Sequence, residues 1–159
     1  MDMILEEMFS SELILPDIKA QSWQEILEKA GDYLFEKGYV KDSFKDALIQ
    51  REYKYPTGLP TNGVRVALPH TDVVHVKKPG ILFMNLDQPV AFKEMGNGER
   101  DVMVDMVFVI AVHHTEKEVE VLRSLMAFFT DEDSLKRLKA CGEKSEMCDF
   151  FDKFLKSKV

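Results

Sequence analysis

Hydrophobic and polar residues alternate over a short stretch in the middle of the chain. Val64, Val66 and Leu68 stand at every second position, which is the pattern of a strand with one buried face. Pro69 ends this predicted strand, because proline has no backbone N–H to give to a sheet. His70 follows directly, where the strand turns into a loop. Strand ends of this kind carry many reactive side chains of α/β proteins, so His70 is the first candidate functional residue.

Two helices are expected before this strand. Ser22 and Glu25 form a capping box that starts the first helix. The second helix extends from about 43 to 54, because the residue before Pro56 disfavours helical geometry. A short edge strand is favoured further upstream, at 13–15.

The second half of the chain continues the alternation of strands and helices. Thr115 and Glu118 form a second capping box, which predicts the start of a helix. Its expected inward face carries Val119, Leu122, Leu125 and Met126. The strands and turns expected before it are a strand at 80–86, a turn at Gln88-Pro89, a turn at 95–99 and a strand at 102–112. Two further helices are expected after it, at 131–138 and 147–155.

This alternation predicts an α/β fold in three layers, with the sheet sandwiched between helices on both faces. The length of 159 residues suits one domain, so residues 1–159 are expected to form a single unit. A hydrophobic content of 45% with 31% charged residues is ordinary for a globular protein.

Charge and hydropathy exclude several functional classes. The formal net charge of −7 argues against binding to a nucleic-acid backbone. No apolar run approaches the roughly 20 residues that cross a bilayer. The first residues include Asp2, Glu6 and Glu7, where a signal peptide would have bases, so a cytoplasmic location is expected.

A histidine at the end of a strand is suited to carry a phosphoryl group. Its unperturbed pKa of about 6.5 leaves a neutral ring nitrogen available for attack near neutral pH. Arg51 could offer a bidentate fork to phosphate oxygens. Thr57 could offer a hydroxyl and Gly58 an unobstructed backbone N–H. Each also has a plain structural explanation: Gly58 as a turn residue and Arg51 as a solvated helix charge.

Taken together, these motifs resemble those of the IIA components of the bacterial sugar phosphotransferase system, fructose/mannitol type. The resemblance lies in Arg51-Glu52, in Pro56-Thr57-Gly58 and in the run Ala67-Leu68-Pro69-His70. Pro69-His70 with His75 and Lys77 further along is similar to the galactitol-specific branch of that family.

The resemblance implies a mixed β-sheet flanked by helices and a phosphorylated histidine at His70. It implies that the group comes from the small carrier HPr and passes to a cysteine of a IIB partner, and then to sugar during uptake by a IIC membrane component. Galactitol or another polyol is the expected sugar. No metal or organic cofactor is implied.

Many members of that family carry a second histidine in the helix after the long apolar strand. When Val119, Leu122 and Leu125 are aligned with the leucines of that helix, Glu118 stands where the second histidine would be. His75 is then the first candidate for an auxiliary role beside His70. Two neighbours, His113 and His114, are further candidates, and a metal site made by them with Glu118 is a weaker alternative.

Two other functions stay open from the sequence. The chain could be a regulatory module, in which the phosphorylation state of His70 controls a partner protein. It could also be a domain that keeps the fold and has lost the chemistry.

Overall fold

The longest elements of the fold are two antiparallel strands, β4 (Gly80–Glu94) and β5 (Asn97–Ala111), in a computed structural model that describes residues 8–157. They are joined by a tight turn in which Gly96 has a φ of +78°, a conformation that glycine adopts without steric cost. The predicted turn at 95–99 and the long apolar strand are therefore confirmed, and β5 begins earlier than the apolar pattern indicated.

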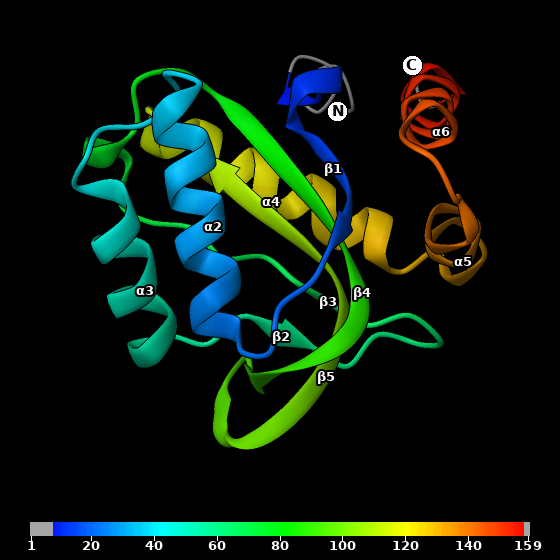
Figure 1. The fold of residues 1–159 in the computed structure, drawn as a ribbon, viewed down its shortest axis with the longest axis horizontal. Coiled ribbons are helices and arrows are strands. Elements are labelled where there is room, and N and C mark those ends of the chain that lie inside the picture. The colour runs from blue at the N-terminus through cyan, green and yellow to red at the C-terminus, as the bar shows by residue number, and fades with distance from the viewer. Residues whose placement is uncertain (1–7, 158–159) are drawn as a thin grey trace.

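Shorter strands extend this hairpin into a mixed sheet, which in the described residues has five strands (Figure 1). The edge strand β1 (Ile14–Ile18) pairs parallel to β4. On the other side β3 (Val66–Ala67) pairs parallel to β5, and β2 (Gly58–Leu59) pairs antiparallel to β3. The predicted strands at 13–15 and before His70 are thus confirmed, with bounds that differ.

The expected turn at Gln88-Pro89 is wrong. The β4–β5 pairing continues through this point with a register shift between Asn85 and Val90, which is a bulge rather than a chain reversal. A bulge tolerates proline because it leaves the local backbone unpaired. The ammonium of Lys139 donates to the Leu86 carbonyl at 2.7 Å and so takes up a polar group that the ladder leaves free.

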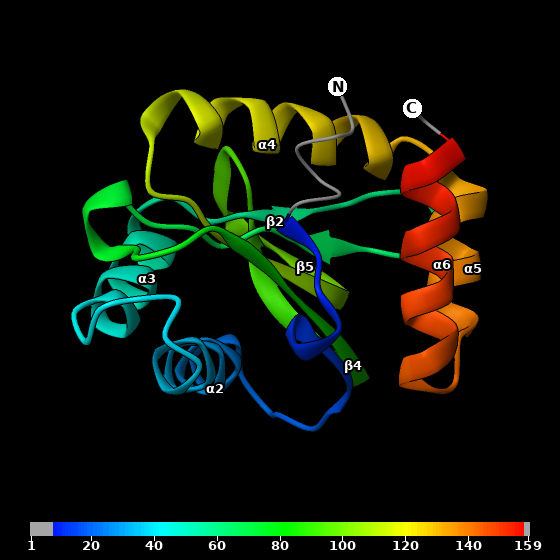
Figure 2. The same cartoon turned by 90° about the horizontal axis from the view of Figure 1, so that it is seen from above.

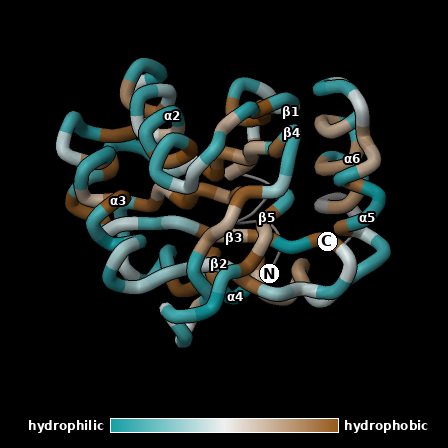
Figure 3. The backbone as a smooth tube through the Cα atoms, turned by 60° about the horizontal axis from the view of Figure 1, so that its bottom comes forward, coloured by the Kyte–Doolittle hydropathy of each residue, from teal (hydrophilic) through white to brown (hydrophobic). Residues whose placement is uncertain are grey.

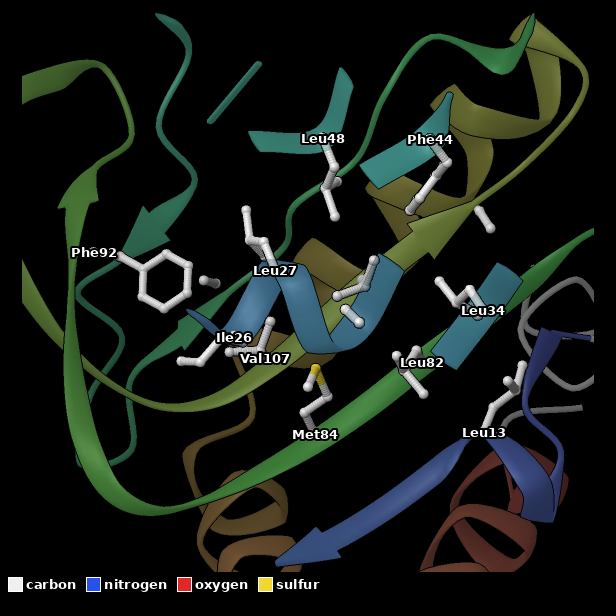
Figure 4. Close-up of a cluster of buried hydrophobic side chains, with 14 of the residues drawn as sticks. Leu13, Ile26, Leu27, Leu34, Phe44, Leu48, Leu82, Met84, Phe92 and Val107 are labelled. Atoms are coloured by element: carbon white, nitrogen blue, oxygen red, sulfur yellow. The ribbon is translucent and has the colours of Figure 1, made fainter. Parts of the chain in front are cut away.

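One face of the sheet is covered by helices α2 (Trp23–Glu36) and α3 (Phe44–Lys54). As predicted, the Ser22 side chain accepts from the Glu25 backbone N–H at 3.1 Å and caps α2. Figure 4 shows side chains from both helices pointing at the sheet, where they form one buried cluster. Its largest members include Ile26, Leu27, Leu34, Phe44, Leu48, Leu82, Met84 and Phe92.

The other face is covered by α4 (Thr115–Phe129), α5 (Glu132–Ala140) and α6 (Lys144–Ser157), as Figure 2 shows. Their apolar residues pack with the second face of the strands, and Figure 3 shows hydrophobic colour along those central strands. This second cluster includes Val66, Phe83, Phe108, Val121, Leu125, Phe128, Leu135, Met147 and Phe151. The α/β sandwich of three layers, with a mixed sheet between helices, is therefore confirmed.

The start and the buried face of α4 differ from the prediction. The N-cap is His114, without a side-chain hydrogen bond, so Thr115 is the first helical residue and the expected capping box is wrong. Val119 and Met126 are 51% and 41% exposed. Leu125 is buried as predicted, and the rest of the buried face lies further round the helix, at Val121, Phe128 and Phe129. The apolar residues run round the helix, so periodicity alone left two faces to choose from.

Residues 8–157 contain no helix that is long and apolar enough to cross a membrane. The acidic start of the chain, residues 1–7, lies outside the described residues.

Candidate functional site

His70 lies where β3 has ended and the chain still runs beside β5. The Ile110 N–H donates to the Pro69 carbonyl at 2.9 Å, and His70 itself forms an isolated parallel bridge with Ile110. Only Val66 and Ala67 are in β3, although Val64, Val66 and Leu68 are all buried as their alternation predicted. The sheet therefore fixes the backbone of His70, while its side chain is only partly buried.

The imidazole of His70 is held in one tautomer. Its Nδ1 lies 2.9 Å from the Leu68 carbonyl oxygen. A carbonyl can only accept, so Nδ1 carries the proton and donates it to this bond. In the neutral ring the other nitrogen, Nε2, then has a free lone pair.

The surroundings of His70 favour this neutral form. Burial is the largest influence and lowers the pKa of His70 below its ordinary 6.5. The bond to Leu68 opposes this shift, the positive charge of Arg51 adds to it, and the negative charge of Asp72 opposes it. The net shift is downward, so the ring is uncharged and nucleophilic at neutral pH.

Arg51 is the cation of this site. It lies in the last turns of α3, where its Nη1 is 3.5 Å from the Asp72 carboxylate. Its guanidinium also lies 5.4 Å from the ring centre of Tyr55. Among the described residues, its Nε is the one buried side-chain nitrogen or oxygen that has no hydrogen-bond partner. Since the pairing with Asp72 is long and the Asp72 side chain is 76% exposed, the guanidinium retains capacity to bind an anion.

Thr57 and Gly58 occupy structural positions. Thr57 is buried and donates to Glu52 from its backbone N–H at 2.8 Å and from its hydroxyl at 2.9 Å. Gly58 belongs to β2, and an added Cβ would lie 2.7 Å from the Lys93 carbonyl oxygen. A phosphate contact from the Thr57 hydroxyl or amide would therefore require its bonds to Glu52 to open.

The sequence indicates Glu52 only as part of the Arg51-Glu52 motif and predicts no role for it. It is 4% exposed, and burial raises its pKa to about 7, against the opposing effect of the bonds from Thr57. A signal existed in the helical spacing: Phe44, Leu48 and Glu52 are four residues apart and are the buried residues of α3.

His75 has partners other than His70. It ends a short 3-10 helix, η2 (Val73–His75), and its Nδ1 lies 2.8 Å from the Ser43 hydroxyl. Its carbonyl accepts from the Lys41 N–H at 2.9 Å. Within residues 8–157 no hydrogen bond or ring contact joins His75 to His70. Its contacts instead fasten the loop after His70 to the start of α3.

The remaining candidates lie at the start of α4. His113 and His114 are exposed, and the centres of their rings lie 4.3 Å apart. Glu118 is half-buried, and burial raises its pKa, with Arg51 lowering it and Asp72 raising it. The charges of Arg51 and Asp72 therefore affect the pKa of Glu118 as well as that of His70. No group of three potential metal ligands exists within residues 8–157, so the alternative metal site is not assembled there.

This geometry can be compared with known proteins. Residues 7–154 match the model of the family described as phosphoenolpyruvate-dependent sugar phosphotransferase system, EIIA 2. The galactitol-specific EIIA component of Escherichia coli K12 is 28% identical over 131 residues, which cover 82% of this chain and 86% of that protein. The ascorbate-specific EIIA component of the same strain is 28% identical over 137 residues, covering 85% and 86%.

The fold gives a matching result. The complex of enzyme IIAMTL and phosphorylated enzyme IIBMTL from Escherichia coli contains a chain that superposes with a TM-score of 0.76 at 27% identity, covering 91% of this chain and 97% of that one. Sequence and structure thus agree over nearly the whole chain, and the chain belongs to the EIIA 2 family of the phosphoenolpyruvate-dependent sugar phosphotransferase system.

Proposed function

We propose that this chain is a phosphocarrier subunit, in which Nε2 of His70 accepts a phosphoryl group from phospho-HPr and passes it to a cysteine of a IIB subunit. The observation that carries this proposal is the bond from Nδ1 to the Leu68 carbonyl, which leaves Nε2 as the nucleophile. Family membership and the mannitol complex named above support a phosphoryl relay with a IIB partner.

Both transfers are displacements at phosphorus. In the first, the Nε2 lone pair attacks phosphorus, and the P–N bond to the donor's histidine breaks with its electron pair returning to that ring. In the second, a thiolate attacks the phosphoryl group on His70, and the electron pair of the broken P–N bond returns to Nε2. Nδ1 keeps its proton throughout, because its bond to Leu68 persists, so the phosphorylated ring is a cation and becomes neutral again when the electron pair returns to Nε2. No proton therefore has to leave the ring before attack.

Arg51 is proposed to bind the phosphoryl oxygens. Its charge acts on His70, and its present partner Asp72 is exposed and 3.5 Å away. Thr57 and Gly58 support the site from the loop before β3, and His75 supports it through Ser43. A guanidinium stabilises charge on a transferring phosphoryl group without undergoing chemistry itself.

The sugar is proposed to be galactitol or another polyol, taken up through a IIC membrane component. The chain itself is proposed to act in the cytoplasm. The galactitol-specific relative and the spacing of Pro69-His70 and His75 favour this choice. A role in transport is favoured over a purely regulatory one, since the galactitol and ascorbate relatives are both components of sugar systems.

Labelling with phosphoenolpyruvate, enzyme I and HPr tests the proposal. The wild type is expected to gain one phosphoryl group, measured by mass spectrometry, and His70→Ala none. His113→Ala is the matched control, because its ring is exposed and should keep full labelling. Labelling of His70→Ala, or an unlabelled wild type, would contradict the proposal. Circular dichroism of His70→Ala should show an unchanged fold.

A further inference from the structure

Arg51, the cation of the site, acts on two carboxylates, one through an ion pair and one through its charge. Asp72 reaches Arg51 from the loop after β3, at 3.5 Å. Glu118 belongs to a different element, α4. The charge of Arg51 lowers the pKa of its carboxyl and the charge of Asp72 raises it. The phosphorylation site therefore holds two negative groups and one guanidinium before any phosphoryl group arrives.

The position of Glu118 follows from the topology. α4 begins five residues after Ile110, which pairs with His70, so its first turns lie at the same end of the sheet as His70. Glu118 precedes the buried Val121 by three residues and Leu125 by seven, which places it on the face of α4 that is turned to the sheet. Figure 2 shows α3, the loop of η2 and the first turn of α4 gathered at this end.

The surroundings of Glu118 already disfavour its charge. The residue is half-buried although it lies in the first turn of α4, and burial raises the pKa of its carboxyl. The charged groups facing it are Arg51 from α3 and Asp72 from the loop, and His114 lies one turn earlier on its own helix. Phosphorylation of His70 adds a phosphoryl dianion and, because Nδ1 keeps its proton, a cationic ring, so it brings one net negative charge to a site that already holds two carboxylates and one guanidinium. This added negative charge disfavours the charged form of Glu118 further.

We propose that Glu118 is a positioning residue that takes up one proton from solvent when His70 is phosphorylated and releases it when the phosphoryl group leaves. This inference rests on the proposed function. In its neutral form Glu118 no longer repels the phosphoryl group and leaves Arg51 to it. The proton balances on the carboxyl alone, since Nδ1 of His70 stays protonated and Nε2 carries phosphorus. Low pH thereby favours the phosphorylated state.

The equilibrium with phospho-HPr tests the inference, measured from pH 6 to 8.5 on wild type, Glu118→Gln and Glu116→Gln. The glutamine mimics the neutral carboxyl, so the equilibrium constant of Glu118→Gln should exceed that of wild type. The ratio should grow with pH by up to about tenfold per unit while one proton is linked to transfer. Using one donor throughout cancels the donor's own pH dependence. Glu116 is exposed on another face of α4 and serves as control, with an expected wild-type profile.

A direct titration needs no variant. The carboxyl carbon of Glu118, followed by NMR, should titrate at higher pH in the phosphorylated than in the unphosphorylated wild type. Equal midpoints, or parallel pH profiles for wild type and Glu118→Gln, overturn the inference while the phosphocarrier function stands. A shift shared by Glu116→Gln also overturns it, because the effect would then be one of general charge. A wild type that takes no label overturns the proposed function and the inference together.

Discussion

Glu52 accepts two hydrogen bonds from Thr57, one from the backbone N–H at 2.8 Å and one from the hydroxyl at 2.9 Å. These bonds join the end of α3 to the start of β2 inside the protein, since both residues are 4% exposed. Arg51 precedes Glu52 in the same helical turn, so the pair also fixes the backbone that presents the guanidinium. The loop before β3 is therefore held by a buried carboxyl.

The buried carboxyl predicts a specific pH dependence of stability. The pKa of Glu52 is raised from 4.5 to about 7, so the folded protein binds a proton there that the unfolded chain releases above pH 4.5. The contribution of this group to the free energy of unfolding is greatest below pH 4.5 and is lost as pH rises through 7. The loss should reach about 3 kcal/mol.

Urea unfolding of wild type and Glu52→Gln between pH 4.5 and 8 measures this. The variant should lose that part of the pH dependence, and at low pH it should be less stable by about 1–3 kcal/mol, because its amide cannot accept all the bonds from Thr57. Glu28→Gln on the exposed side of α2 should keep the wild-type slope. Equal slopes for wild type and Glu52→Gln would contradict the prediction.

Gly58 is predicted to tolerate no side chain. A Cβ there would lie 2.7 Å from the Lys93 backbone oxygen, which the β4 strand holds in place. Gly58→Ala should therefore lower the free energy of unfolding by about 1–3 kcal/mol. Gly98→Ala is the matched control, since the nearest atom to its Cβ would be 3.8 Å away, and its stability should change by less than about 0.5 kcal/mol. Similar stabilities for the two variants would refute this account of Gly58.

The order of the elements could be predicted from local patterns. The Ser22 cap of α2 and the apolar run of β5 each depend on neighbours within a few residues. Local patterns also failed once, at the start of α4, where the expected capping box is absent. The wrong turn depends on a distant partner. Gln88-Pro89 is turn-like in sequence, but pairing with β5 carries β4 through it as a bulge.

The candidate site shows the same division. The sequence indicated His70 and Arg51, because each has its own chemistry at a recognisable position. It could not show that the Thr57 hydroxyl already donates a hydrogen bond to Glu52, since that bond requires the loop to fold back on α3. Nor could it orient His75, whose ring is bound by Ser43 across the start of α3. Partners that are distant in the chain decide which polar atoms are free.

His75 is predicted to affect transfer only through the position of its loop. Its Nδ1 is 2.8 Å from the Ser43 hydroxyl, and losing one such bond costs about 1 kcal/mol. His75→Ala should therefore slow phosphoryl transfer by at most about fivefold. Ser43→Ala should slow it equally, and the double variant no further. A much slower His75→Ala with a normal Ser43→Ala would give His75 a direct role.

Arg51 is predicted to act by its forked shape as well as its charge. Arg51→Lys keeps the positive charge but loses the planar donors, so it should recover only part of the transfer rate. Arg51→Gln should slow transfer by about 100-fold or more, on the scale of one lost electrostatic contact to a reacting group. Stopped-flow measurement of label transfer from phospho-HPr checks both. Lys54→Gln is the control, because this lysine of α3 is exposed and, within residues 8–157, the ion pair of Asp72 is with Arg51 and not with Lys54. Equal rates for Arg51→Gln and Lys54→Gln would remove Arg51 from the site.

The bond between His70 and Leu68 predicts both where phosphorus attaches and how the reaction depends on pH. Because Nδ1 donates to the Leu68 carbonyl, NMR of ¹⁵N-histidine-labelled phosphoprotein should show phosphorus coupled to Nε2. Because burial lowers the pKa of His70, the unphosphorylated ring should titrate below pH 6.5. The neutral nucleophile therefore persists as pH falls through 6.5, and the rate of phosphorylation should decline only at lower pH. Coupling to Nδ1, or a midpoint above 6.5, would mean that the ring leaves Leu68 before it reacts.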